Sequence, residues 1–127
     1  MKKILSYLAI FTLGIGFGAS ITVAGAAEET ARPAYLIVSS DRHAGADYNP
    51  YSQAAGPLAR EAGIKMVASA QEPLVLEGNW PYKNIVLETY PSMDALKQFW
   101  YSDAYQEAKK LREGLATVNF IVAVEAN

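Results

Sequence analysis

The sequence predicts an α+β domain in which a four-stranded antiparallel sheet carries two helices on one face. Strand-forming residues, or the two-residue alternation of a half-buried strand, occur at residues 34–38, 64–70, 84–90 and 117–124. Apolar residues recur at helical spacing after Asn49 and again after Ser92. Prolines and glycines separate these segments, so the predicted order is strand, helix, strand, strand, helix, strand.

The first strand, residues 34–38, is rich in β-branched and aromatic residues and ends at a polar Ser-Ser-Asp sequence. The first helix is expected to begin with Asn49 as a possible N-cap and Pro50 at the first helical position, where a missing N–H is tolerated. Gly63 is a typical helix stop. The positions expected to face inward are Tyr51, Ala54, Ala55, Leu58 and Ala62.

The second strand, residues 64–70, alternates apolar and polar positions. Residues 71–82 are predicted to be a connection because they contain two prolines and Gly78, although the apolar run 74–76 could pair as a short edge strand or hairpin arm. The third strand, residues 84–90, ends at Pro91.

Two serines mark the next helical region. Ser92 and Ser102 can each accept a hydrogen bond from a backbone N–H of the following turn, so a helix and a second helical piece are predicted. Gly114 ends this region, and the last strand, residues 117–124, is apolar on both faces. The positions of the second piece expected to face inward are Tyr105, Ala108 and Leu111.

This element order matches the ferredoxin-like βαββαβ motif. The first and last strands are apolar on both sides, so the sheet face without helices would expose an apolar surface unless another layer covers it. A second copy of the chain is the simplest cover. We therefore expect a homodimer in which two sheets pack face to face as a dimeric α/β barrel.

The N-terminus predicts export. Lys2 and Lys3 precede an apolar run that ends in small residues, which is the pattern of a secretory signal peptide over residues 1–26 with cleavage before Ala27. Residues 27–33 are then a short flexible leader and residues 34–127 the folded domain. A periplasmic or secreted location follows. The alternative is an uncleaved membrane anchor, since the apolar run approaches the roughly 20 residues that span a bilayer.

Composition excludes several classes of site. The chain has no cysteine, which rules out disulfides, cysteine nucleophiles, cysteine metal sites and a cysteine-linked lipid anchor. A single histidine excludes a multi-histidine metal site, no calcium-loop signature is present, and no metal is predicted. Loss of the two signal lysines would bring the net charge from −2 to −4, which argues against nucleic-acid binding.

A family resemblance rests on several segments that occur in order. They are the opening strand at residues 34–38, Tyr51 with Pro57-Leu58, the sequence Leu-Glu-Gly-Asn-Trp at residues 76–80, and Ser-Asp-Ala-Tyr-Gln at residues 102–106 followed by Arg112. With these segments the chain resembles domain-of-unknown-function family 1330, a branch of the dimeric α/β-barrel superfamily. It departs from the family pattern in having one glycine at Gly63 where a pair is usual, Arg42 after Asp41 where proline is usual, and an added signal peptide.

The resemblance implies the fold and no particular activity. Related branches include cofactor-independent monooxygenases of aromatic polyketides, haem-dependent enzymes and binding proteins, so the fold does not choose among them. Export would also separate the protein from cytoplasmic nucleotide cofactors. No cofactor is predicted.

Four residues are candidates for catalysis: Asp41, His43, Tyr105 and Arg112. His43 is the only side chain that ordinarily titrates near neutral pH, although a solvated loop position is the preferred explanation for it. Tyr105 and Arg112 lie seven residues apart, which places them on one stripe of a helix, where a phenol and a guanidinium could hold an anionic or enolic ligand. The structural alternative pairs Arg112 with a carboxylate such as Glu88 or Glu77.

The candidates for ligand binding are Tyr51, Glu77, Trp80, Tyr105 and Arg112. We expect a positive φ at Gly78, which would let the Glu77–Trp80 segment fold over a pocket or form a rigid turn on the core. The predicted function is binding of a small apolar or aromatic molecule between sheet and helices. The alternatives are a cofactor-independent monooxygenase or isomerase-like enzyme, with Asp41 or His43 moving a proton, and a non-catalytic structural or stress-associated accessory protein.

Overall fold

The computed structural model of the protein describes residues 30–127. The predicted signal peptide, residues 1–26, lies outside the described residues, as do residues 27–29 of the predicted leader. The described chain forms β1 (Ala34–Arg42), α1 (Asn49–Glu61), β2 (Lys65–Ala70), β3 (Ile85–Tyr90), α2 (Met93–Trp100), α3 (Asp103–Lys110) and β4 (Ala116–Glu125). The second predicted helical region is thus divided into α2 and α3 at Ser102, where the second cap was expected.

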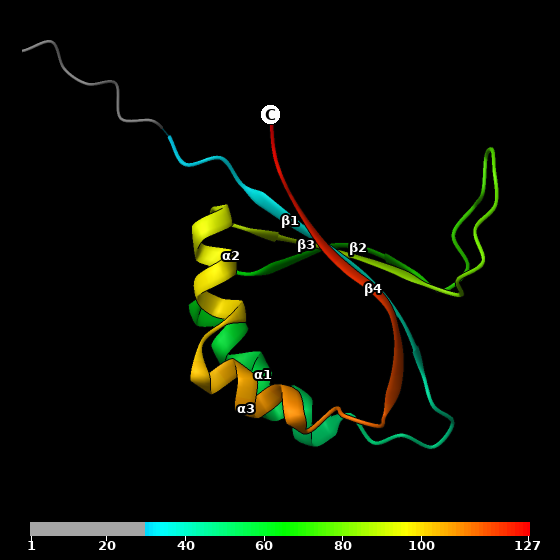
Figure 1. Ribbon diagram of the computed structural model, residues 1–127, viewed down its shortest axis with the longest axis horizontal. Coiled ribbons are helices and arrows are strands. Elements are labelled where there is room, and N and C mark those ends of the chain that lie inside the picture. The colour runs from blue at the N-terminus through cyan, green and yellow to red at the C-terminus, as the bar shows by residue number, and fades with distance from the viewer. Residues whose placement is uncertain (1–29) are drawn as a thin grey trace, which may run out of the picture.

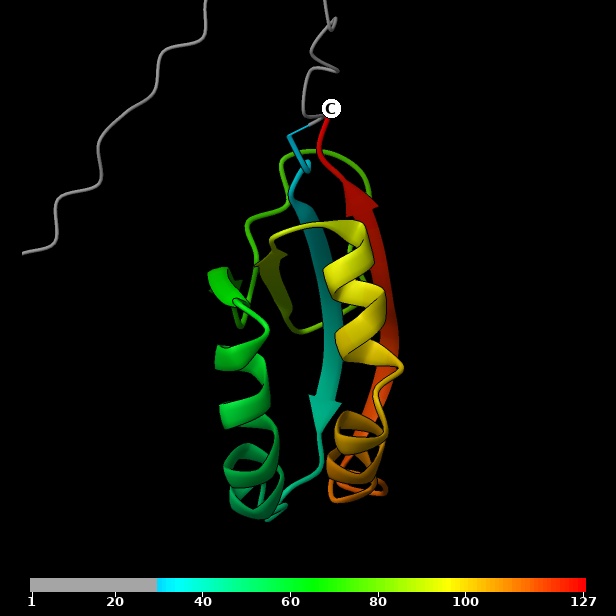
Figure 2. The same ribbon diagram turned by 90° about the vertical axis from the view of Figure 1, so that its left-hand side faces the viewer.

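The four strands form one antiparallel sheet in the order β2-β3-β1-β4. Leu36 of β1 lies opposite Glu88 of β3 on one side and Ala123 of β4 on the other. All three helices cover the same face of this sheet (Figures 1 and 2). This is the ferredoxin-like βαββαβ arrangement, and it confirms the predicted fold class.

The helix caps follow local sequence at two of three helices. The Ser92 hydroxyl accepts from the Ala95 N–H, and the Ser102 hydroxyl accepts from the Tyr105 N–H, as predicted. At α1 the predicted cap is displaced by one residue, because Tyr48 occupies the N-cap and no side chain caps the helix there. The Asn49 N–H instead donates to the carboxylate of Asp47, which stabilises the turn before the helix.

The core lies between the helices and the sheet. Because side chains alternate along a strand, Leu36 and Val38 point to the helices and Ile37 points to the opposite face. The prediction that Leu111 faces inward is wrong: α3 ends at Lys110, and Leu111 is 45% exposed. The buried core residues are Ala34, Leu36, Ala55, Tyr90, Leu96, Phe99, Tyr105 and Ala108.

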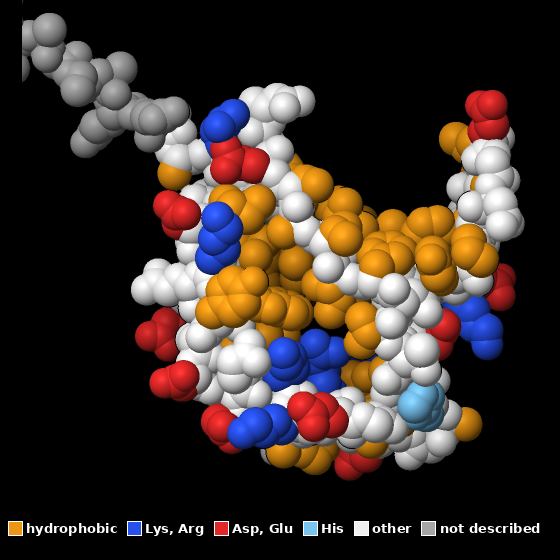
Figure 3. Space-filling view, in the orientation of Figure 1, with side chains coloured by type: hydrophobic (Ala, Val, Ile, Leu, Met, Phe, Trp, Pro, Cys, Tyr) orange, Lys and Arg blue, Asp and Glu red, His pale blue; other side chains and the backbone are white. Residues whose placement is uncertain are grey.

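The opposite sheet face, which we call the open face, carries mainly apolar side chains and no helix among residues 30–127. Val122 and Val124 of β4 are 46% and 47% exposed on it. The connection between β2 and β3 projects beside this face and forms no strand, so the possible edge strand at residues 74–76 is absent. Figure 3 shows hydrophobic side chains gathered along the hollow between the sheet and this connection.

Candidate functional site

A cavity of about 410 Å³ lies between the helices and the sheet, and we call it the inner cavity. Strand alternation supplies one wall and the inward stripes of the helices supply the other. Its walls are largely apolar, and they include Leu36, Val38, Val86, Phe99, Trp100 and Ile121. A smaller set of polar side chains enters the same space from α1, β1, β3 and the end of α3.

Four tyrosines line the inner cavity, and three of them come from helices or strands: Tyr51 from α1, Tyr90 from β3 and Tyr105 from α3. The hydroxyls of Tyr51 and Tyr105 lie 3.3 Å apart and share a hydrogen bond. The Tyr105 ring is buried, and its centre lies 4.4 Å from that of Phe99. Each phenol therefore has its ring packed in the core and its hydroxyl at a polar cluster.

Burial dominates the electrostatics of this cluster. It raises the pKa of Tyr51 well above the usual range, and the hydrogen bond with Tyr105 adds to the increase. Burial also raises the pKa of Tyr90, and the nearby Glu88 charge raises it further. The pKa of Glu88 itself is raised by burial, with the Tyr90 hydroxyl partly opposing the change. The cavity thus holds a carboxyl that is harder to ionise than usual, beside the Tyr51 and Tyr90 phenols, whose ionisation burial also opposes.

Arg112 lines the inner cavity from the turn that follows α3. Its guanidinium carbon lies 5.6 Å from the centre of the Tyr51 ring, and its Nε is buried without a hydrogen-bond partner. Among residues 30–127 the ion pairs join Arg32 to Glu125 and Lys110 to Glu107, so Arg112 pairs with neither Glu88 nor Glu77. The described residues therefore do not form the ion pair with a carboxylate that was the structural alternative for Arg112.

The structure brings together three of the sequence-derived candidates, namely Tyr51, Tyr105 and Arg112. The other four lie elsewhere. The carboxylate of Asp41 accepts a hydrogen bond of 3.2 Å from Asn119 and is not part of the cavity wall, whereas its neighbours Ser40 and Arg42 are. Strand alternation explains this, because Asp41 points to the opposite face from Ser40.

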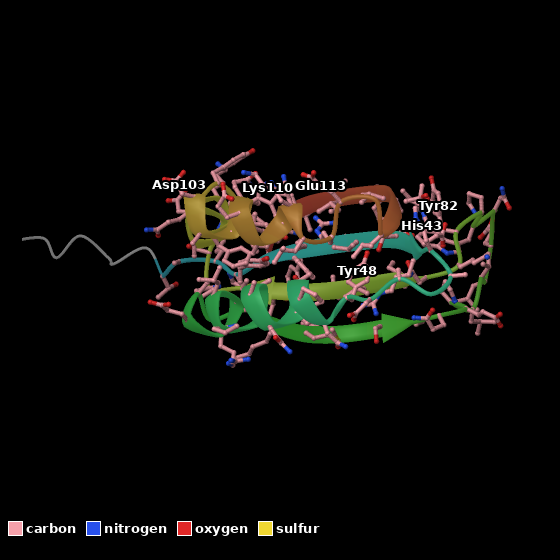
Figure 4. The ribbon with its side chains drawn as sticks, turned by 90° about the horizontal axis from the view of Figure 1, so that it is seen from below. His43, Tyr48, Tyr82, Asp103, Lys110 and Glu113 are labelled. Carbon is pink, nitrogen blue, oxygen red and sulfur yellow. The ribbon has the colours of Figure 1, made fainter. Side chains whose placement is uncertain are left out.

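His43 follows the end of β1 and is exposed (Figure 4). Its Nδ1 donates to the carbonyl oxygen of Gly114 at 2.9 Å, and its Nε2 lies 3.1 Å from the hydroxyl of Thr117. These contacts attach the loop after β1 to the start of β4. They place the ring outside the inner cavity wall.

Glu77 and Trp80 also lie away from the cavity. Glu77 is exposed in the projecting connection, and Gly78 has the expected positive φ of 85°. The Trp80 ring packs edge-on against Tyr82 and Phe120, with centres 5.2 and 5.9 Å apart. This segment forms a turn anchored by aromatic packing and does not fold over the inner cavity.

Six polar wall residues were not among the candidates: Ser40, Arg42, Tyr48, Ser52, Glu88 and Tyr90. The guanidinium carbon of Arg42 lies 4.2 Å from the centre of the Tyr48 ring, beside the start of α1 (Figure 4). A signal for Glu88 was present in the sequence. It alternates with Leu87 and Thr89 in a strand, and a charged residue on the helix-covered face of a strand is unusual enough to indicate a functional position.

Two further properties concern only residues 30–127. They contain no group of three or more acidic or histidine side chains placed to hold a metal ion. Within that part of the chain, no helix has the length and apolarity needed to cross a bilayer.

The fold and cavity define an α+β protein of ferredoxin-like topology with an aromatic-lined space between its helices and its sheet. The chain belongs to the family described as domain of unknown function 1330, whose match covers residues 33–126. No curated protein matches the chain.

Solved structures show the same fold. A protein of unknown function from Rhodopseudomonas palustris superposes with a TM-score of 0.53 at 21% identity, covering 76% of this chain and 83% of that one. Its methylated form gives a TM-score of 0.55 at 20% identity, with 76% and 82% covered. A hydroxynitrile lyase from Passiflora edulis gives 0.53 at 14% identity, with 77% and 95% covered. At these identities the likeness shows the fold alone.

Proposed function

We propose that the protein binds a small, mostly apolar molecule in the inner cavity. The observation that carries this proposal is the cavity itself, whose volume of about 410 Å³ falls within the range of small-molecule sites. Its apolar walls match a hydrophobic ligand, and the convergent Tyr51, Tyr105 and Arg112 side chains supply the few polar groups that orient one.

A neutral fluorescent probe, N-phenyl-1-naphthylamine, tests this function because its emission rises in an apolar site. Ala59 lines the cavity from α1, and Ala59→Phe would occupy part of the space. Ala104→Phe makes the same change at an exposed position of α3 and serves as the control. We expect saturable binding to the unmodified protein and to Ala104→Phe, and loss of binding in Ala59→Phe. Equal binding to all three would place the probe on another surface and reject the proposal.

The cellular setting of the proposal is an exported homodimer. The pattern of residues 1–26 supports export, and an intact mass of the exported protein that begins at Ala27 would test it. The exposed apolar side chains of the open face support the dimer, because a monomer would leave them in water.

Proton-transfer catalysis is the second candidate, and Glu88 is the observation that favours it. A carboxyl with a raised pKa beside tyrosine hydroxyls has the properties of a general acid or base. The small molecule recovered from the unmodified protein and from Glu88→Gln distinguishes the two functions. Catalysis predicts that the two proteins yield different compounds, because the inactive variant would retain unconverted substrate. Simple binding predicts the same compound from both proteins.

A further inference from the structure

A second cavity of about 380 Å³ adjoins the inner one, and we call it the outer cavity. It lies between the end of α3 and the first half of β4. The two cavities share three wall residues, Trp100, Arg112 and Ile121. Figure 3 shows Lys or Arg side chains inside an opening between the helices and β4. Arg112 therefore stands at the junction of an entrance and an inner space.

The guanidinium of Arg112 has an unused hydrogen-bonding capacity at this junction. Its Nε is buried without a partner, and no described carboxylate forms an ion pair with it. Leaving a buried donor of a charged group without an acceptor costs considerable free energy. A ligand oxygen at this position would supply the acceptor.

The charged residues around both cavities favour a negative ligand. Arg42, Arg112 and Glu88 line the inner cavity, and Lys109, Arg112 and Glu113 line the outer one, so cations outnumber acids in each. Lys110 is paired with Glu107, whereas Lys109 forms no ion pair within residues 30–127 and lies 5.6 Å from the centre of the Trp100 ring. The side chains around the outer cavity, where a ligand would enter, therefore carry a net positive charge.

We propose that the ligand is an aromatic carboxylate, whose carboxylate binds the Arg112 guanidinium at the junction and whose ring system fills the inner cavity. A planar guanidinium is suited to a carboxylate because it can donate two parallel hydrogen bonds. The neighbouring Phe99, Trp100 and Tyr105 rings offer stacking and edge contacts to a flat apolar body. Lys109 draws the anion into the outer cavity. This inference rests on the proposed binding function and adds the chemical class of the ligand.

A matched pair of probes, 2-naphthoate and 2-naphthamide, tests the inference by calorimetry at neutral pH. The two have almost the same shape, but only naphthoate carries a charge. We expect the unmodified protein to bind naphthoate about tenfold to hundredfold more tightly than the amide, as a charged hydrogen bond contributes in a buried site. Arg112→Gln should remove this preference without weakening the amide, and Arg112→Lys should keep part of it.

The outcomes separate the two levels of the proposal. Equal affinity for naphthoate and naphthamide, or an unchanged preference in Arg112→Gln, would overturn the carboxylate inference and leave apolar binding intact. Failure of both probes to bind, together with failure of N-phenyl-1-naphthylamine, would overturn the binding function itself. Binding of N-phenyl-1-naphthylamine without either naphthalene probe would overturn the aromatic carboxylate alone.

Discussion

The hydroxyl of Tyr51 on α1 lies 3.3 Å from the hydroxyl of Tyr105 on α3, so one hydrogen bond joins the two helices at the wall of the inner cavity. Tyr105 is buried, and the centre of its ring lies 5.3 Å from that of the Trp100 ring. The pair therefore combines a structural contact between helices with a polar edge that a ligand can reach. Substitutions that remove only the hydroxyl separate these two roles.

Tyr105→Phe should reduce the free energy of unfolding by about 1 kcal/mol, because one hydrogen bond is lost while the ring packing remains. Tyr105→Ala should cost roughly 3–5 kcal/mol because it also leaves a cavity beside Phe99. Urea unfolding of both variants at equal protein concentration measures the difference. Similar losses for Phe and Ala would contradict the view that ring packing carries most of the stability.

Glu88→Gln should change the dependence of stability on pH. Burial raises the native pKa of Glu88 above 4.5, so the native state keeps a proton that the unfolded state releases. The native protein therefore loses stability as the pH rises from about 4.5 through the native pKa, and the loss persists at higher pH. Glutamine has no such titration, so the variant should be more stable than the unmodified protein at pH 7, with the advantage disappearing below about pH 4.5.

Unfolding curves across this pH range test the Glu88 prediction, and Glu61→Gln is the matched control. Glu61 is exposed at the end of α1, so its substitution removes the same formal charge without removing a buried carboxyl. An advantage for Glu88→Gln that does not vary with pH, or that Glu61→Gln reproduces, would show that burial of Glu88 is not the cause.

Gly63→Ala should destabilise the protein more than Gly45→Ala. Both glycines have a positive φ, of 73° and 76°, which costs other residues about 1–2 kcal/mol. A Cβ at Gly63 would also lie 3.1 Å from Cγ of Pro91, whereas one at Gly45 would meet no atom within 4 Å. We expect a loss of about 1 kcal/mol for Gly45→Ala and roughly 2–3 kcal/mol for Gly63→Ala in urea unfolding. Equal losses would mean that Pro91 moves aside without cost.

The fold was predictable because its signals are local. Strand alternation, the serine caps and Gly63 each act within a few residues, and together they give the order of the elements. The errors occur where tertiary contacts decide. Asp47 rather than Asn49 supplies the side-chain hydrogen bond before α1, and Leu111 lies outside the core because α3 ends one residue earlier.

The candidate site was predictable only in part, since proximity in space depends on how elements pack. Tyr105 and Arg112 both line the inner cavity, but not as one helical stripe, because α3 ends at Lys110 and Arg112 lies in the turn beyond it. Local spacing also could not show which strand residues face them. Asp41 and His43 lie near the end of β1, yet alternation and the contact of His43 with Gly114 direct both side chains away from the cavity. Glu88 reaches it because β3 lies beside β1 in the sheet, a pairing of distant segments that no local pattern encodes.

The open face leads to a final prediction, that the protein is a dimer which a charge on β4 disrupts. Val122 and Val124 are almost half exposed on an apolar sheet face, and a second sheet packed on them would bury both. Val122→Lys should therefore shift the mass in light scattering from dimer to monomer, because the partner surface offers no water to a buried ammonium group.

Tyr101→Lys places the same charge at a 73% exposed position between α2 and α3 and should leave the dimer intact. A monomer mass for the unmodified protein at micromolar concentration would reject the barrel, and dissociation of both variants would place the interface on more than the open face.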